Sequence, residues 1–74
     1  MKTIAELLKE GRARKDLTQY QVMEYLGFKS MDRISKWEHG TAEPSAENFR
    51  KLVALYEIPI EEIWMLMGNR IEEF

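Results

Sequence analysis

The sequence predicts an all-α fold, a compact domain of five short helices with a helix-turn-helix at about residues 18–39. Three observations support this prediction. Apolar residues recur at helical spacing along most of the chain, no segment alternates like a strand, and short breaks containing Gly or Pro separate the periodic segments. A chain of 74 residues suffices for one small core. We therefore expect one domain over residues 1–68 and a short C-terminal tail over residues 69–74.

The first two expected helices begin at capping boxes. A Thr-x-x-Glu box at Thr3 precedes a helix that we expect to end around Lys15, and a Thr-x-x-Gln box at Thr18 opens the second helix. In such a box the hydroxyl accepts a hydrogen bond from the backbone N–H of the residue three positions later. The side chain of that later residue accepts in turn from the backbone N–H of the capping residue. The second helix should end at Leu26, because Gly27 favours the left-handed conformation that closes helices.

Three further helices follow. Ser30 is the expected cap of the third, at about residues 30–39, which Gly40 closes. Ser45 caps a fourth, which must end before Pro59 because proline is not tolerated in a helix interior. The fifth carries four apolar residues on one side, of which Ile60, Ile63 and Met67 suit the core face and Trp64 adjoins it. The other expected core residues come from the first four helices and the turn between the second and third: Ile4, Leu7, Leu8, Val22, Leu26, Phe28, Ile34, Trp37, Phe49, Leu52, Val53 and Tyr56.

The composition excludes several classes of site. With no cysteine and one histidine, the chain can form neither a disulfide nor a thiolate zinc site, so we expect no metal and no cofactor. No Gly-rich phosphate loop is present and no set of residues suggests a nucleophile with its base, so we expect no enzyme activity. The first ten residues lack the apolar run of a signal peptide, and no apolar stretch approaches the roughly 20 residues of a membrane span. We therefore expect a cytoplasmic protein without membrane contact.

Charge is divided unevenly along the chain. The net charge of −2 is unusual for a nucleic-acid binder, since such domains are commonly basic. Residues 1–41, however, hold eight Lys and Arg against six acids, a net of +2, whereas residues 42–74 hold three against seven, a net of −4. The basic part coincides with the helix-turn-helix, and the local field at the phosphates decides binding.

Several motifs resemble those of a known family. They are Leu17-Thr18-Gln19, Leu26-Gly27, Ile34-Ser35-Lys36-Trp37-Glu38, Gly40 and Pro44-Ser45. In this order and spacing they resemble the lambda-repressor-like helix-turn-helix family, which includes Cro and the xenobiotic-response-element type regulators, over about residues 3–66. Two features depart from the family pattern: the segment from Gly27 to Ile34 is one residue longer than the usual turn, and Met23 replaces a common Ala. The longer turn leaves three candidates for the first residue of the recognition helix: Lys29, Ser30 and Met31.

The resemblance implies double-stranded DNA as the partner, with the recognition helix in the major groove. It implies DNA contacts from Thr18, Gln19, Lys29, Ser30, Met31, Asp32, Arg33 and Lys36. Gln19 matches a phosphate-contacting position, and free amides at a helix start also favour anions; the alternative is a solvated first-turn residue. Lys36 matches the base-reading position and lies opposite Trp37; the alternative is an ion pair with Asp32.

The other candidate contacts suit more than one partner on DNA. Arg33 suits guanine or phosphate, Asp32 can accept from cytosine or hold Lys36, and Met31 can contact a thymine methyl. Two further cations, Lys29 and Arg14, are either phosphate contacts or solubilising charges.

Two structural expectations follow from the resemblance. Arg12 and Glu38 match the family's ion pair between the first helix and the end of the recognition helix, so we expect a bidentate, partly buried pair. The C-terminal helix and tail carry more apolar residues than one helix can turn inward, and many family members dimerise near this end. We therefore expect a homodimer with contacts from Trp64, Met65, Leu66, Ile71 and Phe74.

These inferences together predict a sequence-specific transcriptional regulator, a repressor, with no evident small-molecule ligand. The alternative is a protein-interaction module, antitoxin-like or an adaptor, on the same fold. The acidic balance of residues 42–74 and the apolar C-terminal surface suit that alternative.

Overall fold

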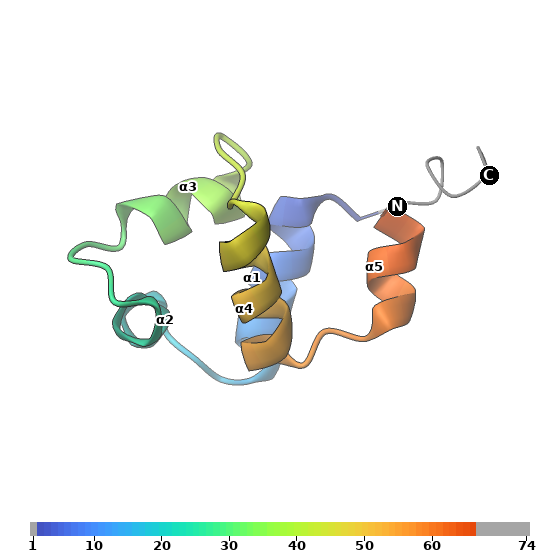
Figure 1. Ribbon diagram of the computed structural model, residues 1–74, viewed down its shortest axis with the longest axis horizontal. Helices are drawn as coiled ribbons and strands as arrows, with labels where there is room; N and C mark the ends of the chain where they lie inside the picture. The colour runs from blue at the N-terminus through green and yellow to red at the C-terminus, as the bar shows by residue number, and fades with distance from the viewer. Residues whose placement is uncertain (1, 67–74) are drawn as a thin grey trace.

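The computed structural model describes residues 2–66, and these form five α-helices and no strand, as predicted (Figure 1). The helices are α1 (Ile4–Arg14), α2 (Gln19–Leu26), α3 (Asp32–His39), α4 (Ala46–Tyr56) and α5 (Ile60–Leu66). None of the helices in this range is long and apolar enough to cross a membrane. The expected domain boundary at residue 68 and the tail over residues 69–74 lie outside the described residues.

Local sequence signals place most helix ends. Both capping boxes are present: the Glu6 amide donates to the Thr3 hydroxyl at 3.2 Å, and the Gln21 amide donates to the Thr18 hydroxyl at 3.1 Å. Gly27 closes α2 in the left-handed conformation, with a φ of 77°. The Ser45 hydroxyl caps α4 by accepting from the Asn48 amide at 3.2 Å. The predicted starts of α1, α2 and α4 are therefore confirmed.

The start of α3 differs from the prediction. The helix begins at Asp32, its N-cap is Met31 with no side-chain hydrogen bond, and Ser30 is not the cap. The reason lies in the turn. The Phe28 amide donates to the Met23 carbonyl at 3.0 Å, the six-residue bond that follows a left-handed Gly27. This bond sets Phe28 against Trp37, and the longer turn then uses three more residues before helical geometry begins.

The core lies between α1, α3 and α4, and among residues 2–66 it has eight buried members: Leu7, Leu8, Val22, Ile34, Trp37, Leu52, Tyr56 and Ile58. The predicted members that pack at its edge and are only partly buried are Ile4, Leu26, Phe28, Phe49, Val53 and Ile63. Ile58, which follows the fourth helix, was not among the predicted core residues. It is buried directly after Glu57, which closes α4 in the left-handed conformation with a φ of 52°.

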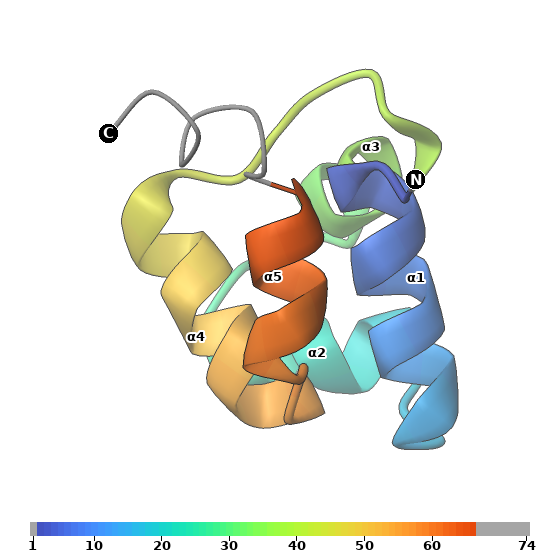
Figure 2. The ribbon, with the colours of Figure 1, turned by 90° about the vertical axis from the view of Figure 1, so that its right-hand side faces the viewer.

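The orientation of α5 also departs from the prediction. Ile60 was expected in the core but is 62% exposed, whereas Leu66, expected at the outer surface, is half-buried and packs on the core beside Ile63. Two contacts accompany this orientation: the preceding Ile58 is buried, and the Glu62 carboxylate accepts from Lys2 Nζ at 2.6 Å. Figure 2 shows α5 in front of α1 and α4, on the side away from α2 and α3.

Candidate nucleic-acid interface

Helices α2 and α3 lie together at the end of the molecule opposite α5 (Figure 1). Ile34 and Trp37, 1% and 5% exposed, hold α3 against the core. The exposed side chains of α3 that carry charge are Asp32, Arg33 and Lys36, with His39 at its end. Because the apolar face is fixed inward, these polar residues form the outward face of the helix.

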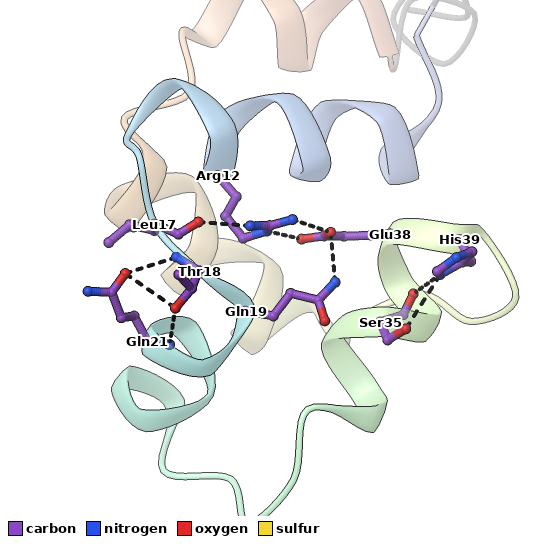
Figure 3. Close-up of polar contacts among 8 residues, drawn as sticks. All are labelled: Arg12, Leu17, Thr18, Gln19, Gln21, Ser35, Glu38 and His39. Carbon is purple, nitrogen blue, oxygen red and sulfur yellow. Dashed lines mark hydrogen bonds and ion pairs between the residues drawn. The ribbon is translucent and has the colours of Figure 1, made fainter.

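An ion pair fixes α3 to α1 (Figure 3). Arg12 donates from Nε to Glu38 Oε2 at 2.7 Å and from Nη2 to Glu38 Oε1 at 3.0 Å, a bidentate pair. Its Nη1 donates to the Leu17 carbonyl at 2.8 Å, so the guanidinium also holds the segment that leads into α2. The Glu38 side chain is 4% exposed and that of Arg12 is 19% exposed. The hydrogen bond with Glu38 raises the pKa of Arg12 above its ordinary value.

Gln19 belongs to the same network. Its Nε2 donates to Glu38 Oε1 at 3.1 Å, and the residue is half-buried rather than fully solvated. Because a carboxylate only accepts hydrogen bonds, this contact fixes the amide with its nitrogen toward Glu38. Within residues 2–66, the second N–H of Nε2 and the backbone amide of Gln19, which lies in the first turn of α2, donate no other hydrogen bond. Gln19 is thereby held in one conformation at the start of α2.

Three predicted contact residues gather at the turn between α2 and α3. Lys29, Ser30 and Arg33 line, with Phe28, a hollow of about 250 Å³. The Arg33 guanidinium lies over the Phe28 ring, with Cζ 4.7 Å from the ring centroid. The Ser30 hydroxyl accepts from the Asp32 amide at 3.4 Å.

The remaining candidates have different surroundings. Met31 is exposed at the start of α3, and the Thr18 hydroxyl is engaged in its capping box. Lys36 is exposed, and within residues 2–66 no ion pair joins it to Asp32. Arg14 donates to the Tyr56 carbonyl at 3.5 Å, at the C-terminal end of α4. Arg14 thus has a local structural partner.

Two contacts within the site were missed by sequence reasoning. The Gln19 to Glu38 hydrogen bond and the cation-π contact of Arg33 with Phe28 both join residues whose proximity depends on tertiary structure. The hydrogen bond between Gln19 and Glu38 could have been inferred, because Gln19, Arg12 and Glu38 all match positions of one family pattern. Nothing in the spacing of Phe28 and Arg33 indicated the second, because the turn between them has no regular period.

Comparison with known proteins identifies the family. A helix-turn-helix family model matches residues 8–63, which include all of α2, α3 and α4. No individual curated protein and no solved structure shows significant similarity. The match covers most of the chain and contains the ion pair, the capped start of α2 and the outward face of α3. The chain therefore belongs to the helix-turn-helix family of the lambda-repressor and xenobiotic-response-element type, a family of DNA-binding regulators.

Proposed function

We propose that this protein is a sequence-specific regulator of transcription, a cytoplasmic repressor without catalytic activity, which binds double-stranded DNA with α3 in the major groove. One observation carries the proposal: α3 is anchored by Ile34 and Trp37, while Arg33 and Lys36 face outward beside the start of α2. An outward polar face on a rigidly held helix suits readout of base edges.

Two residues have separate roles in this proposal. Gln19 positions the protein by donating to a backbone phosphate, because its side chain is held at the start of α2 where free amides also favour anions. Lys36 reads a base, because it is exposed on the face of α3 opposite Trp37. Thr18, Met31 and Asp32 complete the contact surface around them.

The test compares Gln19→Ala with Lys36→Ala. Gln19→Ala should weaken binding to all duplexes alike, whereas Lys36→Ala should lose about 1–3 kcal/mol of discrimination at one base pair per half-site. Selection from random duplexes, followed by gel-shift titration, measures both effects. If wild type and Lys36→Ala select the same motif, Lys36 does not read a base. If the wild-type protein selects no duplex, the proposed function is wrong.

We further propose that the regulator acts as a homodimer through α5. Trp64 and Met65 are 55% and 64% exposed, and Ile60 adds a third exposed apolar side chain on the same short helix. Exposed apolar patches of this kind usually mark an interaction surface. The expected tail contacts, Ile71 and Phe74, lie outside the described residues. Two-fold pairing would separate the recognition helices by about 34 Å, one turn of DNA.

Sedimentation at increasing concentration tests the dimer. Wild type should associate in the micromolar range, and Trp64→Ser should shift this association to higher concentration without a loss of helix content. The matched control is Tyr20→Ser, which also removes an exposed aromatic residue but on α2. A monomer at all concentrations that binds single and paired half-sites equally would contradict dimerisation.

A protein-interaction module is the second candidate. The same exposed residues of α5 favour it, because they lie beside acidic Glu61 and away from α3. In that case Trp64→Ser should abolish capture of a partner protein, and Lys36→Ala should have no effect on it. DNA selection by the wild-type protein separates the two functions.

A further inference from the structure

We infer that the turn between α2 and α3 is a binding site for one DNA backbone phosphate, in which Phe28 is the positioning residue for Arg33. The site rests on the proposed DNA-binding function and gives Arg33 a backbone role instead of a base-reading one. It also gives a role in binding to Phe28, a residue without a polar group.

A chain of aromatic contacts leads from the core to Arg33. Trp37 is 5% exposed, and the Phe28 ring meets it edge to face with centroids 5.9 Å apart and an interplanar angle of 69°. The Arg33 Cζ lies 4.7 Å from the centroid of the Phe28 ring, within the roughly 6 Å limit of a cation-π contact. The position of the Arg33 guanidinium is thus set by the core through Phe28.

The contact with the Phe28 ring leaves the hydrogen-bond donors of Arg33 available. A guanidinium carries five N–H donors, and within residues 2–66 none of those of Arg33 meets a protein acceptor. Within residues 2–66 no carboxylate forms an ion pair with Arg33. Holding the side chain in place before DNA arrives also lowers the entropy cost of binding. Arg33 is therefore a preorganised, unneutralised donor of the kind that binds phosphate oxygens bidentately.

Other donors converge on the same place. Lys29 and Ser30 line the hollow of about 250 Å³ together with Phe28 and Arg33. The start of α3 adds backbone amides: the Asp32 amide donates to the Ser30 hydroxyl at 3.4 Å, but the N-cap, Met31, makes no side-chain hydrogen bond to the other amides of the first turn. Asp32 stands exposed at this helix start, and its single charge reduces the positive field of the two cations without cancelling it. Two cations, a hydroxyl and free amides fit a singly charged phosphodiester.

The first experiment separates phosphate binding from base reading. Arg33→Gln should weaken binding to every duplex alike, lower the slope of log K against log salt by about 0.9, and leave the selected sequence unchanged. Arg50→Gln removes the same charge from the exposed surface of α4 and is the matched control, with little change in affinity or slope. Replacing single phosphates of the duplex by neutral methylphosphonates should locate one position whose effect disappears in Arg33→Gln.

The second experiment tests Phe28. Phe28→Leu keeps every charge and should weaken DNA binding about two- to fivefold. This factor corresponds to the loss of a cation-π contact of about 0.5–1 kcal/mol, since about 1.4 kcal/mol changes a binding constant tenfold. In the Arg33→Gln background Phe28→Leu should have no further effect, and Phe28→Tyr, which keeps the ring, should bind like wild type. A purely structural role of Phe28 would weaken binding equally in both backgrounds. The Arg33 Cδ protons should also show an upfield ring-current shift in the free wild-type protein, a measurement that needs no variant.

Several results would overturn the site. They are an unshifted Arg33 Cδ resonance, additive effects of Phe28→Leu and Arg33→Gln, or a changed base preference in Arg33→Gln. If the turn binds a partner protein instead of DNA, the wild-type protein should capture that partner, Arg33→Gln should not, and added duplex DNA should not compete with the capture. If the wild-type protein selects a duplex but Arg33→Gln keeps the wild-type salt slope, the phosphate site fails while the proposed function stands.

Discussion

Separating Arg12 from Glu38 should reduce stability strongly, by an amount that depends on which partner is removed. In Arg12→Ala the Glu38 carboxylate, 4% exposed, loses two donors and keeps only the Gln19 amide. Breaking a pair this deeply buried costs about 3–4 kcal/mol. In Glu38→Ala the guanidinium keeps the Leu17 carbonyl and, at 19% exposure, reaches water, so the cost is smaller, about 2–3 kcal/mol.

The double variant should be more stable than the sum of the two losses implies, because it leaves no buried charge without a partner. We expect a coupling free energy of about 2–3 kcal/mol between Arg12 and Glu38. Thermal and urea unfolding of the four proteins measure it, at about 4–8 °C of melting temperature per kcal/mol for a domain of this size. Additivity within about 0.5 kcal/mol would refute the proposed coupling.

The ion pair of Lys15 with Glu57 is the matched control. It also joins α1 to a distant helix end, with Lys15 Nζ 2.6 Å from Glu57 Oε2, but the Glu57 side chain is 73% exposed. Solvent screens such a pair, so a cycle of Lys15→Gln and Glu57→Gln should be close to additive. Equal coupling in both pairs would mean that burial does not set the strength of the Arg12 pair.

Two further predictions concern stability. Gly11→Ala should destabilise the domain by up to about 2 kcal/mol, because the added Cβ would lie 3.0 Å from Tyr56 Cδ2. This overpacking outweighs the gain of about 1 kcal/mol in helix propensity. A melting temperature above that of the wild-type protein would contradict the prediction. Stability should fall as pH drops below about 4.5, because Lys15 lowers the folded-state pKa of Glu57 and Lys2 that of Glu62, each from 4.5. The stability that these two carboxylates contribute is fully present above their unfolded-state pKa and is lost as pH falls through their folded-state pKa. The melting temperatures of Glu57→Gln and Glu62→Gln should therefore change less between about pH 5 and pH 3 than the melting temperature of the wild-type protein, because each variant lacks one of the two titrating groups.

The features that sequence predicted well are those set within a few residues. Capping boxes at Thr3 and Thr18 and the left-handed Gly27 each depend on contacts along one short stretch of chain. Glu57 shows the limit of this reasoning. It closes α4 in the conformation that normally favours Gly, and it does so because Ile58 is buried behind it and Pro59 ends the helix.

The features that sequence missed depend on how whole elements pack. Ile60 was expected inside because it lies three residues before Ile63, but the burial of Ile58 and the pairing of Glu62 with Lys2 decide how α5 is rotated. In the same way, α3 starts at Asp32 because Phe28 packs against Trp37 and the turn needs three more residues after Phe28. Helical periodicity shows which residues share one face of a helix, but tertiary contacts decide which face is turned toward the core.

Two adjacent residues of α3 connect the core to both proposed phosphate contacts. Trp37 packs against Phe28, and Arg33, at the start of the same helix as Trp37, makes a cation-π contact with the Phe28 ring. Glu38 accepts from Gln19 at the start of α2 and is itself held by Arg12 of α1. The positions of Gln19 and Arg33 relative to each other are therefore set by one rigid helix instead of by two independent loops. In the proposed complex these residues bind the DNA backbone, and this shared anchor fixes the depth and angle at which the outward face of α3 enters the groove.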